Sequence, residues 1–175
     1  TAGTTCAADN QVDFITSSGT ITIPANSAST TFTVPYCGDL YDEFNESFSA
    51  TLSNPSNGVI GTATATATIT DDDATPIISV SDVSVCEPET GTAAAVFTIT
   101  RTGLSYLTST VNVNTVDGTA TTSDNDYVGI LTPGGQVVTF NPTVTTVTVP
   151  VTVNGDTKFE TDETFTLQIV GTATN

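Results

Sequence analysis

The sequence predicts an all-β protein built from tandem antiparallel β-sandwiches of the immunoglobulin-like kind. Polar and apolar residues alternate along most of the chain, clusters of turn-forming residues separate the alternating runs, and no segment carries a helical apolar stripe. The 175 residues are enough for one large domain or two small ones. A long stretch of the sequence also occurs twice, which favours two domains.

The alternating runs predict eight strands, because β-branched residues at every second position suit a strand with one packed face and one wet face. These strands cover residues 20–23, 31–34, 47–53, 62–70, 96–100, 110–116, 146–153 and 164–170. Turn formers such as NPSNG (54–58), PGG (133–135) and NGD (154–156) lie between them. The apolar residues at the inward positions are the expected core: Phe32, Phe48, Phe97, Val147, Phe165 and Leu167.

The internal repeat relates residues 13–53 to residues 126–170, with Glu46 matching Glu163 at an offset of 163 − 46 = 117 residues. We expect residues 1–74 to form the C-terminal part of a first module, and residues 75–175 to form a second module without its last strand. Each copy is then incomplete in this segment. The expected partners are neighbouring repeats of the same chain or adjacent subunits, which supply the missing strands by strand addition.

The charge balance limits the classes of partner and activity. The chain has 19 acidic residues, two basic residues, no His and a net charge of −17. Nucleic acids and anionic membranes are bound through Lys and Arg, so neither is an expected partner. No apolar run approaches the ~20 residues that span a bilayer. Without His or a G-x-S-x-G motif, the chain is not expected to be an enzyme, and its composition favours an exported surface protein.

Carboxylates gather at strand ends and in turns, where loops from one end of a sandwich meet. Asp71, Asp72 and Asp73 stand side by side and repel one another unless a cation lies among them. Calcium takes six to eight oxygen ligands in irregular geometry, which suits mixed Asp and Glu, whereas the absence of His argues against zinc. The alternatives are a solvated acidic linker and acids that serve solubility alone.

Four blocks resemble the Calx-beta domain, the calcium-binding module of sodium/calcium exchangers that also recurs in tandem in bacterial adhesins. They are NPSNGVIGTATATATITDDD (54–73), VCEPETGTAAAVFTITR (85–101), DGTATTSDNDY (117–127) and VPVTVNGDTKFETDETFTL (149–167). The resemblance covers nearly the whole chain and implies Ca²⁺ as the bound metal. The ligands that it implies are Asp13, Glu43, Glu46, Asp71, Asp72 and Asp73 in the first copy, and Glu87, Asp126, Glu160 and Glu163 in the second. The first copy lacks the opening Glu and the second lacks the Asp cluster.

The three cysteines allow at most one internal disulfide. Cys6 and Cys37 both lie near turns at the acidic end of the first copy, and we expect them to be bridged, the alternative being two small buried thiols. Cys86 precedes Glu87 and is either free or paired outside the copy.

The leading functional hypothesis is a structural, calcium-binding repeat segment of an extracellular protein, namely a cell-surface adhesin, a fibre or a matrix protein. Calcium would cancel the repulsion among the carboxylates and stiffen the joint between consecutive domains. The alternative is a regulatory calcium-sensor module of a transporter such as a sodium/calcium exchanger, which would require membrane spans elsewhere and a cytosolic setting.

Overall fold

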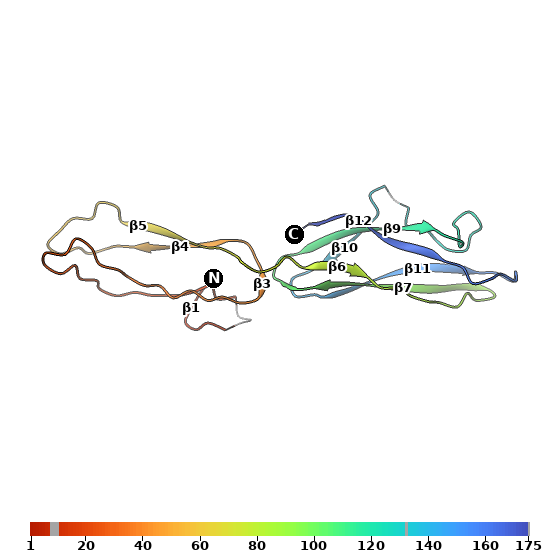
Figure 1. Cartoon of the computed structure of the whole chain (residues 1–175), viewed down its shortest axis with the longest axis horizontal. Helices are drawn as coiled ribbons and strands as arrows, with labels where there is room; N and C mark the ends of the chain where they lie inside the picture. The colour runs from red at the N-terminus through yellow and green to blue at the C-terminus, as the bar shows by residue number, and fades with distance from the viewer. Residues whose placement is uncertain (8–10, 132, 175) are drawn as a thin grey trace. The chain divides into compact units, whose positions relative to one another are not determined.

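The structure is a computed structural model that describes residues 1–7, 11–131 and 133–174 (Figure 1). Within these residues the chain forms strands and turns without any helix, so the predicted all-β class is confirmed. The described chain accordingly contains no helix of the length and hydropathy that a membrane crossing requires. The chain divides into two compact units, Thr1–Asp73 (unit 1) and Ala74–Asn175 (unit 2).

Unit 2 is a sandwich of two antiparallel sheets. Its strands are β6 (Ile77–Val80), β7 (Gly91–Thr102), β8 (Leu104–Ser105), β9 (Ser109–Asp117), β10 (Gln136–Phe140), β11 (Thr146–Gly155) and β12 (Phe165–Thr174). One sheet has the order β11-β7-β6 and the other has the order β10-β9-β12 (Figure 1). The long β7–β11 ladder keeps one register from Thr100 opposite Thr146 to Gly91 opposite Gly155.

The core of unit 2 comes from the inward positions of both sheets, as the alternation of period two requires. Ile99 of β7 and Val113 of β9 are fully buried, as is Phe140 of β10. Phe97 and Leu167 are buried as predicted, and the partly buried Val147 and Phe165 pack against them. Each fully buried side chain of this set stabilises the fold by about 1.5–3 kcal/mol.

Unit 1 contains shorter strands, namely β1 (Ala2–Gly3), β2 (Phe14–Ile15), β3 (Tyr41–Asp42), β4 (Glu46–Thr51) and β5 (Thr64–Ile69). β4 pairs antiparallel with β5, with Phe48 opposite Ala67. The predicted strands at 20–23 and 31–34 are wrong, because both segments lack strand structure. The reason is that the described residues of unit 1 supply no strand beside either segment, whereas the matching strands of unit 2, β10 and β11, pair with β9 and β7.

The missing partners also expose the apolar face of unit 1. Ile21, Ile23 and Phe32 are 41%, 57% and 43% exposed. By the repeat offset they correspond to Val138, Phe140 and Val149, which are all buried in unit 2. The assignment of Phe32 to the core is therefore wrong, while Phe48 is partly buried and stacks on Phe14. Among the described residues of unit 1, no apolar side chain is buried.

Candidate metal centre

Three carboxylates of unit 2 converge from separate parts of the sequence. Asp126 lies in the turn before Tyr127, and Glu160 and Glu163 lie in the segment between β11 and β12. One carboxylate oxygen from each lies within 4.8 Å of the others. Calcium binds oxygen at about 2.3–2.6 Å, so two ligands of one ion lie at most ~5 Å apart. One calcium ion can therefore contact all three acids.

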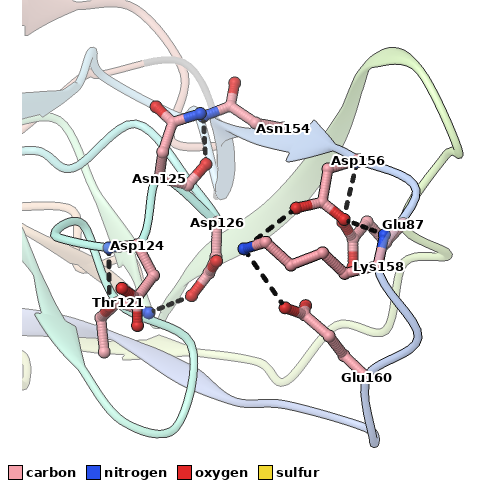
Figure 2. Close-up of polar contacts among 9 residues, drawn as sticks. All are labelled: Glu87, Thr121, Asp124, Asn125, Asp126, Asn154, Asp156, Lys158 and Glu160. Atoms are coloured by element: carbon pink, nitrogen blue, oxygen red, sulfur yellow. Dashed lines mark hydrogen bonds and ion pairs between the residues drawn. The ribbon is translucent and has the colours of Figure 1, made fainter.

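The turn that carries Asp126 is held by its own hydrogen bonds. The Thr121 N–H donates to Asp126 Oδ2 (2.7 Å), and the Asp126 N–H donates to the Thr121 carbonyl (3.2 Å). Asn154 of β11 donates from its backbone N–H to the Asp126 carbonyl (2.8 Å) and from Nδ2 to the Asn125 carbonyl (2.8 Å) (Figure 2). These bonds hold the Asp126 carboxylate in place against the end of β11.

An aromatic stack brings the turn to the second pair of acids. The ring of Tyr127 lies on the ring of Phe165, with centroids 4.2 Å apart and planes 12° apart. Tyr127 follows Asp126 directly and Phe165 follows Glu163 by two residues, so stacking the rings places the two carboxylates side by side. The Tyr127 hydroxyl donates to Asp117 Oδ1 (2.5 Å). Burial, together with this bond, raises the pKa of Tyr127 to about 12, and the bond lowers the pKa of Asp117.

Unit 1 repeats this construction with different residues. Phe14 stacks on Phe48 with centroids 4.5 Å apart, and the Cys37 N–H donates to the Asp13 carbonyl (2.8 Å) as Asn154 does to Asp126. Asp13 and Glu46 both lie beside residue Thr1. Two of the predicted ligands thus lie close to each other in unit 1.

All the acids assigned to the first copy line one pocket of about 70 Å³ in unit 1, namely Asp13, Glu43, Glu46, Asp71, Asp72 and Asp73. The Asp71 N–H donates to Asn45 Oδ1 (2.9 Å), which fixes the start of the triplet beside the E-x-x-E turn. Burial, followed by the charges of Asp39 and Glu46, raises the pKa of Glu43. The pocket therefore holds like charges that a bound cation would relieve.

Glu87 lies near the three converging acids of unit 2 without belonging to the tight group. Its Oε1 accepts a hydrogen bond from the Asp156 N–H (3.3 Å). The pKa of Glu163 is raised first by burial and then by the charges of Asp126, Glu160 and Glu87. The structure thus collects every acid assigned to the second copy at one end of unit 2.

Comparison with known families identifies the family of both units. The model of the Calx-beta domain matches residues 3–73 and again residues 71–174. The chain belongs to the Calx-beta family. The predicted tandem of Calx-beta domains is confirmed. Calx-beta domains are calcium-binding β-sandwich modules and form a non-catalytic family. No curated protein matches the chain.

Lys158 is a residue of the second Calx-beta unit that the sequence analysis missed. Its Nζ lies 3.3 Å from Asp156 Oδ2 and 3.8 Å from Glu160 Oε1, between the two carboxylates (Figure 2). These contacts raise the pKa of Lys158, and the backbone and side-chain bonds from Lys158 lower the pKa of Asp156. The sequence contained a signal, because the chain's single lysine lies two residues before the E-x-x-E pair, at the position of Tyr41 in the first copy.

We expect Lys158→Met to tighten calcium binding at the second Calx-beta unit. The ammonium group competes with a metal for Glu160, and removing it frees this carboxylate. Because both ion pairs are exposed, the gain in affinity is modest, roughly threefold to tenfold. Calcium titrations followed at the amides of Asp126 and Glu163 by NMR measure this site separately. Lys158→Arg keeps the charge and should leave the affinity unchanged, whereas equal affinities for all three proteins would contradict a competing role.

The two Calx-beta units also differ in how the ligand turn is tied down. Cys6 and Cys37 form a disulfide with a Cα–Cα distance of 5.5 Å, and Cys86 is free and exposed. Cys37 occupies the place that Asn154 takes in unit 2, where hydrogen bonds from Asn154 hold the turn. The Asp13 turn is thus fixed covalently and the Asp126 turn is not.

Proposed function

We propose that this chain is a structural, calcium-binding repeat segment of a cell-surface adhesin, fibre or matrix protein. The observation that carries the proposal is the convergence of Asp126, Glu160 and Glu163 at one end of a Calx-beta sandwich. Three carboxylates leave several of the six to eight calcium positions for backbone carbonyls, water and further acids. Glu87 is a further candidate in the same unit, because its charge helps to raise the pKa of Glu163.

Calcium would act in this protein as a stiffener. Asp71, Asp72 and Asp73 are the last residues of unit 1 and directly precede Ala74, the first residue of unit 2. Their carboxylates share a pocket with Asp13, Glu43 and Glu46. A cation bound there attaches the end of unit 1 to the body of unit 1, and so removes the freedom of the segment that leads to the next repeat.

The disulfide supports an extracellular setting, because such bonds persist in oxidising compartments and are rare in the cytosol. A regulatory sensor attached to a cytosolic face of a transporter would meet reducing conditions, which disfavours this alternative. Neighbouring repeats are the proposed partners of unit 1. Their strands would cover the exposed Ile21, Ile23 and Phe32 as β7 and β9 cover the matching positions of unit 2.

Backbone ¹⁵N relaxation tests the stiffening directly. With calcium, we expect the two units to tumble with one rotational correlation time; with chelator, each should tumble faster and separately. A triple Asp71→Asn, Asp72→Asn and Asp73→Asn variant should behave in calcium as the native chain does in chelator. If the correlation times change neither on adding calcium nor in the triple variant, a stiffening role is excluded.

A further inference from the structure

The segment of residues 117–121 connects β9 to the turn that carries Asp126. It lies against the residue before β12, because a Cβ atom at Gly118 would lie only 2.2 Å from the carbonyl oxygen of Thr164. Thr164 directly follows Glu163. The segment therefore lies between the two parts of the chain that supply the candidate ligands of unit 2.

Two hydrogen bonds hold the Glu163 side of the site to this segment. The Ala120 N–H donates to the Thr164 carbonyl oxygen (3.0 Å), and the Thr164 N–H donates to Thr119 Oγ1 (2.8 Å). Both backbone polar groups of Thr164 are thus bonded to the segment. Since Glu163 precedes Thr164 directly, the position of its carboxylate depends on the position of residues 117–121.

Asp117 holds the other side of the site, the turn of residues 121–127. Its Oδ1 accepts hydrogen bonds from the Tyr127 hydroxyl (2.5 Å) and the Thr122 N–H (3.1 Å), and its Oδ2 accepts one from the Thr122 hydroxyl (3.3 Å). Tyr127 is buried, so its hydroxyl needs a partner within the protein, and Asp117 supplies one. One carboxylate therefore binds both ends of the turn, with Asp126 between them.

These bonds oppose the charges of the site. Asp126, Glu160 and Glu163 have carboxylate oxygens within 4.8 Å of one another, and like charges at this distance repel. The repulsion favours an open arrangement, in which the turn moves away from the start of β12. A site that is held closed before a cation arrives binds it more tightly, because binding then carries no cost of rearrangement.

We propose that Asp117 is a positioning residue of this metal centre, which holds Asp126 beside Glu163 and is not itself a ligand. Its effect on calcium affinity rests on the calcium function proposed above, whereas its effect on the turn does not. Loss of its hydrogen bonds should weaken calcium binding at unit 2 about tenfold, the lower end of the usual effect of losing a group that orients metal ligands.

Two substitutions of Asp117 separate its hydrogen bonds from its charge. Asp117→Asn removes the charge but keeps an acceptor oxygen for Tyr127 and Thr122, whereas Asp117→Ala removes both. Calcium titrations of the full chain, followed by NMR at the amides of Asp126 and Glu163, measure unit 2 separately. We expect Asp117→Asn to stay within about threefold of the native affinity, and Asp117→Ala to lose about tenfold. Equal losses would overturn the positioning role, because charge alone would then explain them.

Tyr127→Phe tests the same link without changing any charge. It removes the hydroxyl that bonds to Asp117 and keeps the ring that stacks on Phe165. If Asp117 acts through this hydroxyl, the two substitutions share one effect, so the double variant Asp117→Ala, Tyr127→Phe should bind calcium about as weakly as Asp117→Ala alone. Losses that multiply would mean that each side chain acts independently, which contradicts the proposal.

Hydrogen exchange in chelator distinguishes this role from the calcium function. Thr121 and Asp126 each donate a backbone N–H to the other, and Asp117→Ala should speed exchange at both amides while β7 and β11 stay protected. This pattern in a chain whose unit 2 binds no calcium would support the hold of Asp117 on the turn and overturn the proposed function. Native calcium affinity in Asp117→Ala, with both turn amides still protected, would overturn the positioning role alone. If Asp117→Ala also unfolds β7 and β11, Tyr127→Phe decides, and native affinity in that variant would refute the role.

Discussion

Calcium is expected to raise the melting temperature of this chain more than any single substitution in it. Binding to the folded state alone adds about 2.7 kcal/mol when free calcium is one hundred times Kd. For units of this size that corresponds to a shift of roughly 10–20 °C. The physical reason is the release of repulsion among carboxylates held together at Asp126, Glu160 and Glu163. Scanning calorimetry in calcium and in chelator measures the shift.

Two substitutions identify the source of this stabilisation. Asp126→Asn keeps an oxygen for the Thr121 N–H but removes one ligand charge, and should abolish most of the shift in unit 2. Asp82→Asn removes the same charge from an exposed residue between β6 and β7, and should leave the shift intact. Magnesium should stabilise less than calcium, because it requires strict octahedral geometry. Superimposable melts of the native chain in calcium and chelator would refute the metal site.

Loss of the Cys6–Cys37 disulfide is expected to destabilise unit 1 by about 3–4 kcal/mol in the chain-entropy model. The bridge spans 31 residues of sequence. Loss of the bridge should unfold unit 1, because its described part has no buried apolar side chain to offset the conformational entropy that the chain then gains. In a Cys6→Ser, Cys37→Ser double variant, we expect rapid hydrogen exchange in β4 and β5 and unchanged protection in β7 and β11.

Cys86→Ser is the matched control, because Cys86 is exposed and free and its replacement should alter neither unit. The double variant should also lose calcium affinity at unit 1, since the Cys37 N–H holds the Asp13 carbonyl and the bridge fixes this contact. Unit 2 serves as an internal reference, because Asn154 holds its turn without a disulfide. Protection of β4 and β5 that survives the double substitution would show that other contacts stabilise unit 1.

Alternation predicted strands reliably only where the chain also supplies a neighbouring strand. Residues 110–116 and 146–153 became long paired strands, whereas residues 20–23 carry the same pattern and form none. The pattern reports which face of a segment is apolar. Pairing needs a second backbone at about 4.8 Å, and the segment itself contains no information about whether that backbone is present.

The acids of the candidate site could be predicted because their places follow from short motifs next to strand ends. The role of Asp117 could not, since it depends on the distance between two segments. Asp117 lies at the end of β9 and accepts from Tyr127 only because the turn folds back onto the strand. Lys158 is a different case, because its partners Asp156 and Glu160 lie only two residues before and after it in the sequence.

The sequence by itself determined the all-β class, the twofold repeat and the acids that gather at the sandwich ends, because each of these follows from local periodicity or from self-similarity. Only the tertiary structure decided which acids share one site and which strands of the described residues lack a partner. These features depend on contacts between residues distant in the chain. Such contacts form only when stacked rings, paired strands and a disulfide bring separate segments together.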